Sequence, residues 1–262
     1  MGYFTKTIRP DIINGAVANV IASNKTDNPF TAGDILFDWT AVDVPVRTNA
    51  IVDGIIHAYG EDGSNQVVGD IMLLVVQSNS GAAPTSLGTV NAGITGCYEL
   101  PDILMNVMKF EGGASQAGKL DIGIHGSCYY WNIGSEHGQQ GPLVIQPESN
   151  TLPGVSSKTR IWIAGIAGGA FDFSTGVLLN VAENVADDAT KGLAVDGVDP
   201  RKAFREGDTV YIHDVNTAIG TIASLGANTI TLTDNNVGAI TDDDEFMNAS
   251  PITIKLSFSM KH

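Results

Sequence analysis

The chain has few of the residues that cross-link a protein or anchor it in a membrane. It holds only two cysteines, Cys97 and Cys128, and they do not form a C-x-x-C pair, so a zinc ribbon is excluded. A disulfide between them is compatible with the sequence, but synthesis in a cytoplasm favours two free, partly buried thiols. Nowhere do about 20 apolar residues follow one another, and no apolar stretch of signal-peptide length follows the first residues. We therefore expect no membrane span and no signal peptide.

Positive charge is also scarce. Lys and Arg together number 14 against 29 Asp and Glu, which gives a formal net charge of −15. Such a chain repels phosphate backbones, so neither nucleic acid nor a membrane surface is expected as a partner. The acidity fits a solvent-facing surface that must stay soluble at high local concentration.

The sequence lacks the motifs of common catalytic and cofactor sites. It has no H-E-x-x-H spacing, no G-x-S-x-G elbow and no phosphate-binding P-loop. The glycine-rich stretch 165–169 departs from G-x-G-x-x-G and is expected to permit a bend or bulge in a strand. We expect no enzyme activity and no cofactor, although a sequence cannot place paired carboxylates around a cleft, as a polysaccharide hydrolase would need. The histidines are scattered at His57, His125, His137, His213 and His262.

The pattern that the sequence does hold is that of β-strands. Hydrophobic residues make up 43%, and the 30 glycines follow no G-x-y period, so disorder and collagen are excluded. Residues 252–261 alternate best, which is typical of a half-solvated antiparallel strand. The continuous apolar run 71–76 fits a strand buried on both faces, and 160–166 fits a central strand. Further strands are expected at 51–59 and 119–125.

Two segments allow more than one interpretation. Residues 103–110 fit either a turn of helix or an apolar strand, and the pattern does not decide between them. Residues 1–30 are interpreted as an N-terminal arm, which either packs on a neighbouring subunit or simply leads into the first strand. The apolar residues that a partner would bury share one face of a short helix. They are Ile12, Ile13, Val17, Val20 and Ile21.

The pattern of strands and turns in the sequence changes between about 174 and 248. Short strands recur there every ~10 residues with turn residues between them, which predicts a small barrel or sandwich. Residues 180–191 are interpreted as a soft connector. Because the pattern of the last strand resembles that of the strands before residue 174, we predict that the barrel is inserted before the last strand. The predicted parts are an arm (1–30), a β-sandwich (31–173 plus 249–262) and a small β-barrel module (174–248).

Two parts of the chain resemble structural proteins of bacteriophage particles. The barrel segment has a V-D-G-x-D-P turn at 195–200, a G-D-x-V-Y strand opening at 207–211 and a G-x-I…N-T-I-T-L hairpin within 220–232. This pattern is similar to small β-barrel modules of phage head and tail proteins. The segment 141–147, followed by the strand 160–166, is similar to jelly-roll sandwiches of virion proteins. The resemblance implies a structural role and brings no functional residues with it.

The fold implied is all-β, a jelly-roll-like antiparallel β-sandwich with a second small β-barrel inserted before the last strand. The sequence shows no long helix that could serve as the spine of a common major capsid protein, which favours an accessory surface protein. The resemblance therefore implies a non-catalytic decoration (cement) protein in the virion of a tailed phage, assembled in the host cytoplasm. Its expected partners are the major capsid protein and copies of itself, as a homotrimer on three-fold lattice positions. The alternative is a receptor- or carbohydrate-binding component of the tail or fibre.

Two clusters remain as candidate binding sites. Neighbouring carboxylates hold Ca²⁺ through several oxygens, but the acidic run of this chain lacks the EF-hand spacing and is interpreted first as a solvated turn. An aromatic cluster forms part of a core or subunit interface if it is buried, and stacks on sugar rings or anchors a partner if it is exposed. The acidic run is Asp242, Asp243, Asp244 and Glu245, and the aromatic cluster is Tyr129, Tyr130 and Trp131.

Overall fold

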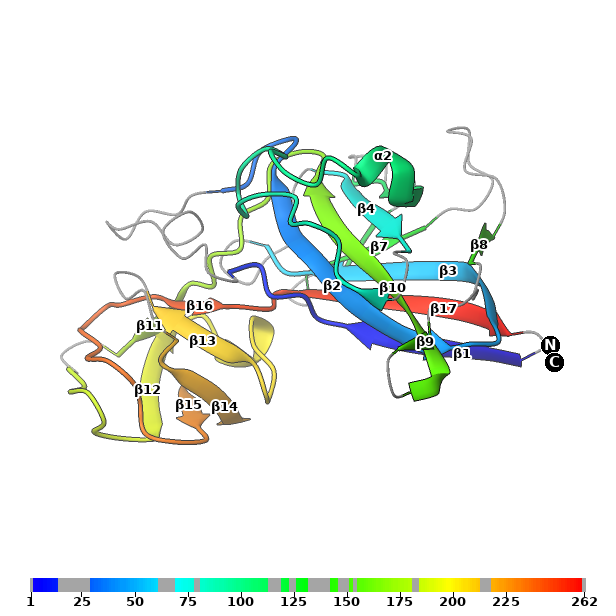
Figure 1. Ribbon diagram of the computed structural model, residues 1–262. Helices are drawn as coiled ribbons and strands as arrows, with labels where there is room; N and C mark the ends of the chain where they lie inside the picture. Colours follow the sequence, from blue (N-terminus) through cyan, green and yellow to red (C-terminus); the bar gives the residue numbers. More distant parts are fainter. Residues whose placement is uncertain are drawn as a thin grey trace.

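The chain folds into three antiparallel sheets with very little helix (Figure 1). Strands hold 53% of the residues and helices 4%, against a helix share of roughly 30–35% in average globular proteins. The predicted all-β class is confirmed. The computed structural model describes residues 2–13, 29–60, 69–77, 81–112, 119–122, 126–131, 142–145, 151–152, 155–180, 184–212 and 218–260.

Two of the sheets face one another as a β-sandwich. The first sheet has the order β1-β17-β3-β7-β6 with β8 beside β3, and the second has the order β2-β10-β4-β5 with β9 beside β10. The strands of the first sheet are β1 (Gly2–Ile8), β17 (Ile252–Met260), β3 (Thr48–Ala58), β7 (Ser127–Tyr130), β6 (Lys119–Asp121) and β8 (Leu143–Val144). Those of the second are β2 (Ile35–Pro45), β10 (Val155–Ala167), β4 (Ile71–Val76), β5 (Leu104–Phe110) and β9 (Thr151–Leu152).

The strand order of this sandwich is that of a jelly roll. When the short strands β6, β8 and β9 are set aside, the remaining strands can be numbered one to eight in chain order. The first sheet then has the order 1-8-3-6 and the second 2-7-4-5. A double-sheet jelly roll is built from eight strands in this way. The structure therefore agrees with the predicted jelly-roll-like sandwich.

The sandwich core lies between the two sheets because its strands alternate. In β17, Ile254 and Phe258 are buried whereas Lys255 is exposed, which confirms the predicted period of two. The central strand β10 lies between β2 and β4, also as predicted. A Cβ atom on Gly165 of β10 would come within 2.2 Å of the Phe37 ring. The register of β10 against β2 shifts at this glycine, so the predicted bulge is present.

The prediction of an N-terminal arm is wrong for the described residues 2–13. Residues 2–8 form β1, which pairs with β17 in continuous register from Gly2 opposite Met260 to Ile8 opposite Ile254. The side of β17 away from β3 needs a hydrogen-bonded neighbour, and the chain's own first residues supply it. Ile12 and Ile13, two of the proposed interface residues, are buried in the sandwich core. The other three, Val17, Val20 and Ile21, lie outside the described residues.

Two expected strands differ in extent from their patterns. The ambiguous segment 103–110 begins in a single helical turn, α2 (Leu100–Ile103), and continues as β5, because pairing with β4 supplies ladder hydrogen bonds along its length. The strand expected at 119–125 is shorter. It ends at Asp121, and the N–H of Ile122 then donates to the carbonyl of Gly126 at 3.0 Å to close a turn. Residues 123–125 lie outside the described residues.

The third sheet is a small, nearly closed barrel. Its order is β11-β12-β15-β14-β13-β16, and a bridge between Leu178 and Glu245 joins its two edges. Its buried side chains, among them Phe204 and Phe246, form a cluster separate from the sandwich core. The barrel lies between β10 and β17 in the chain, as predicted. Its elements are β11 (Val177–Leu179), β12 (Gly192–Gly197), the short η4 turn (Pro200–Lys202), β13 (Thr209–Ile212), β14 (Gly220–Leu225), β15 (Thr229–Leu232) and β16 (Phe246–Asn248).

The predicted soft connector at 180–191 belongs to the barrel in its described residues. Val185 and Ile240 exchange two backbone hydrogen bonds of 2.8 Å, and the N–H of Asp188 donates to the carbonyl of Asn236 at 2.9 Å. The buried side chain of Asn236 binds the same segment. The polar turn residues of this segment led to the prediction of a flexible connector. In the structure, hydrogen bonds to residues 236–240 hold the segment in place.

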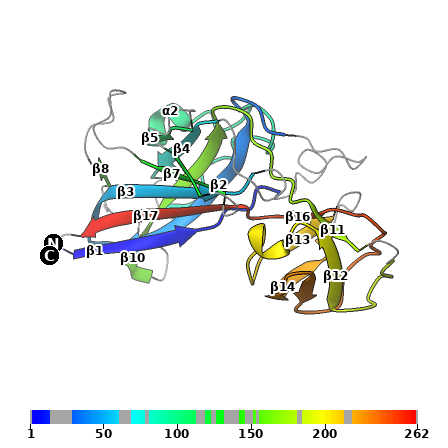
Figure 2. The same ribbon diagram turned by 180° about the vertical axis from the view of Figure 1, so that it is seen from behind.

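The barrel lies at one end of the sandwich and the two chain termini lie together at the other end (Figures 1 and 2). The end of β1 and the beginning of β17 are both next to the barrel, so the residues that follow β1 and precede β17 are placed to contact it. Among the described residues, no helix is long and apolar enough to cross a membrane.

Candidate functional site

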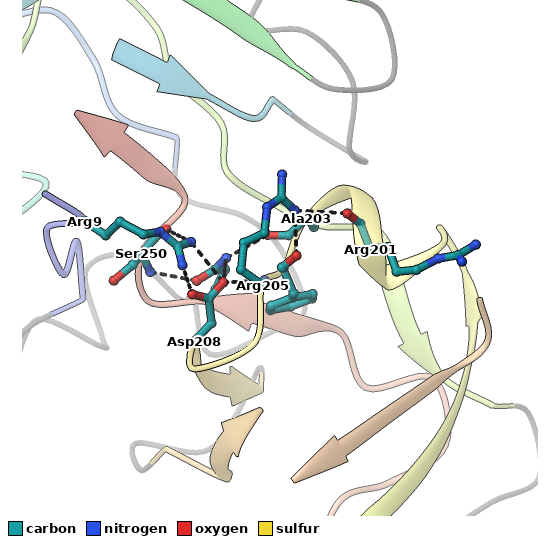
Figure 3. A network of polar contacts seen from close by, with 8 residues as sticks. Arg9, Arg201, Ala203, Arg205, Asp208 and Ser250 are labelled. Atoms are coloured by element: carbon teal, nitrogen blue, oxygen red, sulfur yellow. Dashed lines mark hydrogen bonds and ion pairs between the residues drawn. The ribbon is translucent and has the colours of Figure 1, made fainter. Parts of the chain in front are cut away.

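A buried polar network joins the sandwich to the barrel (Figure 3). Arg9, just after β1, donates to both carboxylate oxygens of Asp208, which lies just before β13; the Nη2–Oδ2 distance is 3.0 Å. Arg9 also donates to the carbonyl of Ser250 at 2.7 Å, just before β17. The Asp208 side chain is only 2% exposed. One guanidinium thus binds both modules at once.

The remaining bonds of this network come from the barrel and from one sandwich tyrosine. The carboxylate of Asp208 accepts from the N–H of Arg205 at 2.7 Å and from the side-chain amide of Asn248 at 2.9 Å. The guanidinium of Arg205 lies 4.9 Å from the ring centroid of Tyr59. Burial, and then the charge of Arg9, lower the pKa of Arg205. These groups bind one another, so the network is suited to holding the two modules in place.

Two of the four carboxylates in the acidic run bind backbone or hydroxyl groups of the protein, whereas Asp243 is exposed. Asp244 accepts from both the N–H and the hydroxyl of Thr241 at 2.7 Å. Glu245 accepts from the backbone N–H groups of Thr175 and Gly176 at 2.6 and 2.8 Å. These two carboxylates order the loops on either side of the barrel edge. Among the described residues, no group of three His, Cys, Asp or Glu side chains is placed to hold a metal ion.

The aromatic cluster divides between core and surface. Tyr129 and Trp131 are buried in the sandwich core, and burial raises the pKa of Tyr129 far above its ordinary value. Tyr130 points the other way and is 38% exposed. Both cysteines are free thiols, as predicted. Desolvation raises the pKa of buried Cys97 and of half-buried Cys128.

The first sheet also has an outer face, the side that points away from the sandwich core; this sheet lies in front in Figure 2. Cross-strand pairing puts Leu120, Cys128 and His57 in one row, and Tyr130, Ile55 and Lys255 in the next. The other histidines lie outside the described residues. By register and alternation, the outer-face side chains of the described strands are Tyr3, Thr5, Thr7, Ala50, Asp53, Ile55, His57, Leu120, Ile122, Cys128, Tyr130, Val144, Thr253, Lys255, Ser257 and Ser259.

This outer face combines apolar exposure with little charge. Among its side chains, Asp53 is the single acid and Lys255 the single Lys or Arg. Eight large apolar or aromatic side chains are exposed among the described residues, and five of them belong to this face. These five are Tyr3, Leu120, Ile122, Tyr130 and Val144. Such a concentration is characteristic of an interaction surface.

The alternation of β6 is reversed relative to the usual pattern. Lys119 is 3% exposed, faces the sandwich interior opposite Tyr129, and pairs with Asp121 at 3.1 Å. Leu120 and Ile122 point outward, and Leu120 is 52% exposed. Sequence reasoning noticed the alternation at 119–125 but could not tell which set of side chains the core would bury. The outer face was therefore missed.

Comparisons with known proteins add no relatives. A scan against protein-family models, a search of curated proteins and a search of solved structures each returned no match.

Proposed function

We propose that this chain is a non-catalytic structural protein of a phage particle that decorates and stabilises the capsid surface. The observation that carries the proposal is the architecture: a jelly-roll sandwich with a small barrel inserted before its last strand. This is the combination that the resemblance to phage head and tail proteins implies. The proposed location is the virion, and the proposed partners are the major capsid protein and further copies of this chain, with a trimer as the form that the resemblance implies.

The network between the modules supports a structural role. A decorating protein has to transmit force between its contact points without opening, and the Arg9–Asp208 pair fixes the barrel to the end of the sandwich. The pair is held by additional hydrogen bonds, which is the condition under which a buried ion pair specifies one geometry. A strongly acidic surface keeps such a protein soluble before it assembles.

The test uses empty capsids of the phage that encodes the chain, prepared without it. Purified full-length protein is added and its binding is measured by co-sedimentation and by imaging of the particles. We expect saturable binding at a fixed number of lattice positions and a higher temperature of capsid opening. Absence of binding to capsids, or binding to the tail alone, contradicts the decoration function.

A second candidate, a receptor- or carbohydrate-binding virion protein, is favoured by one observation. Tyr98, in the loop before α2, is 90% exposed, and exposed tyrosine rings stack on sugars. Binding on a glycan array that is abolished in the Tyr98→Ala variant would support this function. Binding that is unchanged in that variant contradicts a role for Tyr98.

A further inference from the structure

We propose that the outer face of the first sheet binds a second copy of this chain, face to face, across a two-fold axis. The proposal goes beyond the proposed function and does not depend on capsid decoration. It names the surface and the symmetry of the contact, and it differs from a ring of three.

In strand β6, the alternation of inward and outward side chains is the reverse of the usual one. A strand at the side of a sandwich normally buries its apolar side chains and exposes its charges. Here Lys119 and Asp121 pair on the inner side while Leu120 and Ile122 are left on the outer face. The outward position of Leu120 and Ile122 is explained if another surface covers the outer face.

The apolar side chains of the outer face are also contiguous. Leu120 is directly opposite Cys128 across the β6–β7 ladder, and Tyr130 is directly opposite Ile55 across the β7–β3 ladder. Directly opposed residues on one face have their Cβ atoms about 5 Å apart. The patch is therefore continuous across three strands. Val144, on β8, is on the same face but lies farther along β3, opposite Ala50.

The charge of the outer face favours a second copy of the chain as its occupant. With a net charge of −15, two copies of the chain repel one another over most approaches. The outer face carries one carboxylate, Asp53, and one ammonium group, Lys255, so its own charges cancel. A second copy can approach through this face without the repulsion that the rest of the chain generates.

The two charges are placed so that the face complements itself. Lys255 is opposite Ile55 and Ser257 is opposite Asp53, so the lysine and the aspartate lie diagonally on neighbouring strands. Both are exposed, and neither forms an ion pair within the described chain. A two-fold axis repeats every contact twice. It can therefore set each Lys255 against the Asp53 of the other copy.

The experiment measures the mass of the full-length protein by light scattering over a range of concentrations in about 0.15 M salt, where long-range repulsion is screened. We expect twice the mass of one chain. The Leu120→Asp variant should dissociate at least tenfold more readily, with an unchanged circular dichroism spectrum because Leu120 is exposed. Val237→Asp is the matched control, since Val237 is 50% exposed on the barrel, and it should remain a dimer.

Charge reversal tests the two-fold symmetry. Asp53→Lys and Lys255→Glu should each weaken association at least tenfold, because each variant places like charges together twice. The double variant Asp53→Lys with Lys255→Glu should restore it. A wild-type monomer, a trimer, or a dimer that Leu120→Asp does not weaken overturns the contact.

The capsid assay separates this proposal from the proposed function. A monomeric wild type that still binds capsids removes the face-to-face contact and leaves decoration standing. A wild-type dimer that is weakened by Leu120→Asp but does not bind capsids supports the contact and removes decoration.

Discussion

Asp208 is the described barrel residue whose carboxylate binds Arg9 of the sandwich. Its buried carboxylate binds Arg9 and accepts from the amide of Asn248 and the N–H of Arg205. Asp208→Ala leaves these donors without their acceptor, so we expect the free energy of unfolding to fall by about 3 kcal/mol. Urea denaturation followed by circular dichroism measures it.

The matched control for Asp208 is an exposed acid of the same module. Asp234 lies 3.9 Å from Lys191, and its side chain is almost fully exposed. Exposed pairs of this kind contribute about 0–1 kcal/mol, so Asp234→Ala should change stability by less than that. Equal losses in the two variants would show that the network is no stronger than a surface ion pair.

A second residue, Glu99, gives a pH-dependent prediction. Hydrogen bonds from Thr85, first from its side chain and then from its backbone N–H, lower the pKa of Glu99. A lowered folded pKa contributes stability above the ordinary value of about 4.3 and loses it as pH falls through the folded pKa. We therefore expect the Thr85 amide to lose hydrogen-exchange protection only as the pH falls below the ordinary glutamate pKa, after correction for the intrinsic exchange rate.

Glu99→Gln is the control for this prediction. Glutamine still accepts a hydrogen bond but does not titrate, so protection of the Thr85 amide in this variant should not change as the pH is lowered over the same range. The same loss of protection in both proteins would trace the effect to another group.

At the scale of elements, β10 depends on the absence of a side chain at Gly165. A methyl group there would meet the Phe37 ring at 2.2 Å. Gly165→Ala should therefore destabilise the protein by about 1–3 kcal/mol through overpacking, as measured by urea denaturation. Gly192→Ala in β12, where no atom lies within 4 Å of the added carbon, should have little effect. Phe37→Leu should lessen the effect of Gly165→Ala; additive losses would mean that the two sites are not in contact.

The elements also show where sequence patterns suffice. The alternation of β17 and the continuous apolar run of β4 are set by local residue order, and both strands were predicted with nearly their observed bounds. Strand β1 was missed because its residues become a strand by pairing with β17, far along the chain. The face exposed by β6 could not be predicted, because a period of two is the same whichever set is buried.

At the scale of the whole molecule, the sandwich should fold without the barrel. The two modules have separate apolar cores. Replacing residues 174–248 with a short glycine-serine linker should leave a folded β protein that is less stable than the full chain, because Met247 packs in the sandwich core. A replacement of 174–246, which keeps Met247, is expected to be more stable. Circular dichroism and thermal unfolding compare the two, and an insoluble product from both would show that the modules share one core.

The same pair of proteins tests the coupling between modules. Arg9→Ala should destabilise the full chain, because it unpairs buried Asp208, and should have little effect once the barrel is removed. An equal loss in both backgrounds would show that Arg9 acts within the sandwich alone.

The sequence by itself determined the β class, the central strand and the position of the inserted module. These follow from residue period and turn chemistry, which are local properties of the chain. The tertiary structure alone decided that residues 2–8 complete the first sheet, that Tyr129 and Tyr130 face opposite ways, and that the acidic run binds loops. It also decided that the outer face exposes five large apolar or aromatic side chains and carries one Asp and one Lys. Such choices depend on which surfaces meet across the chain, and no local pattern records that.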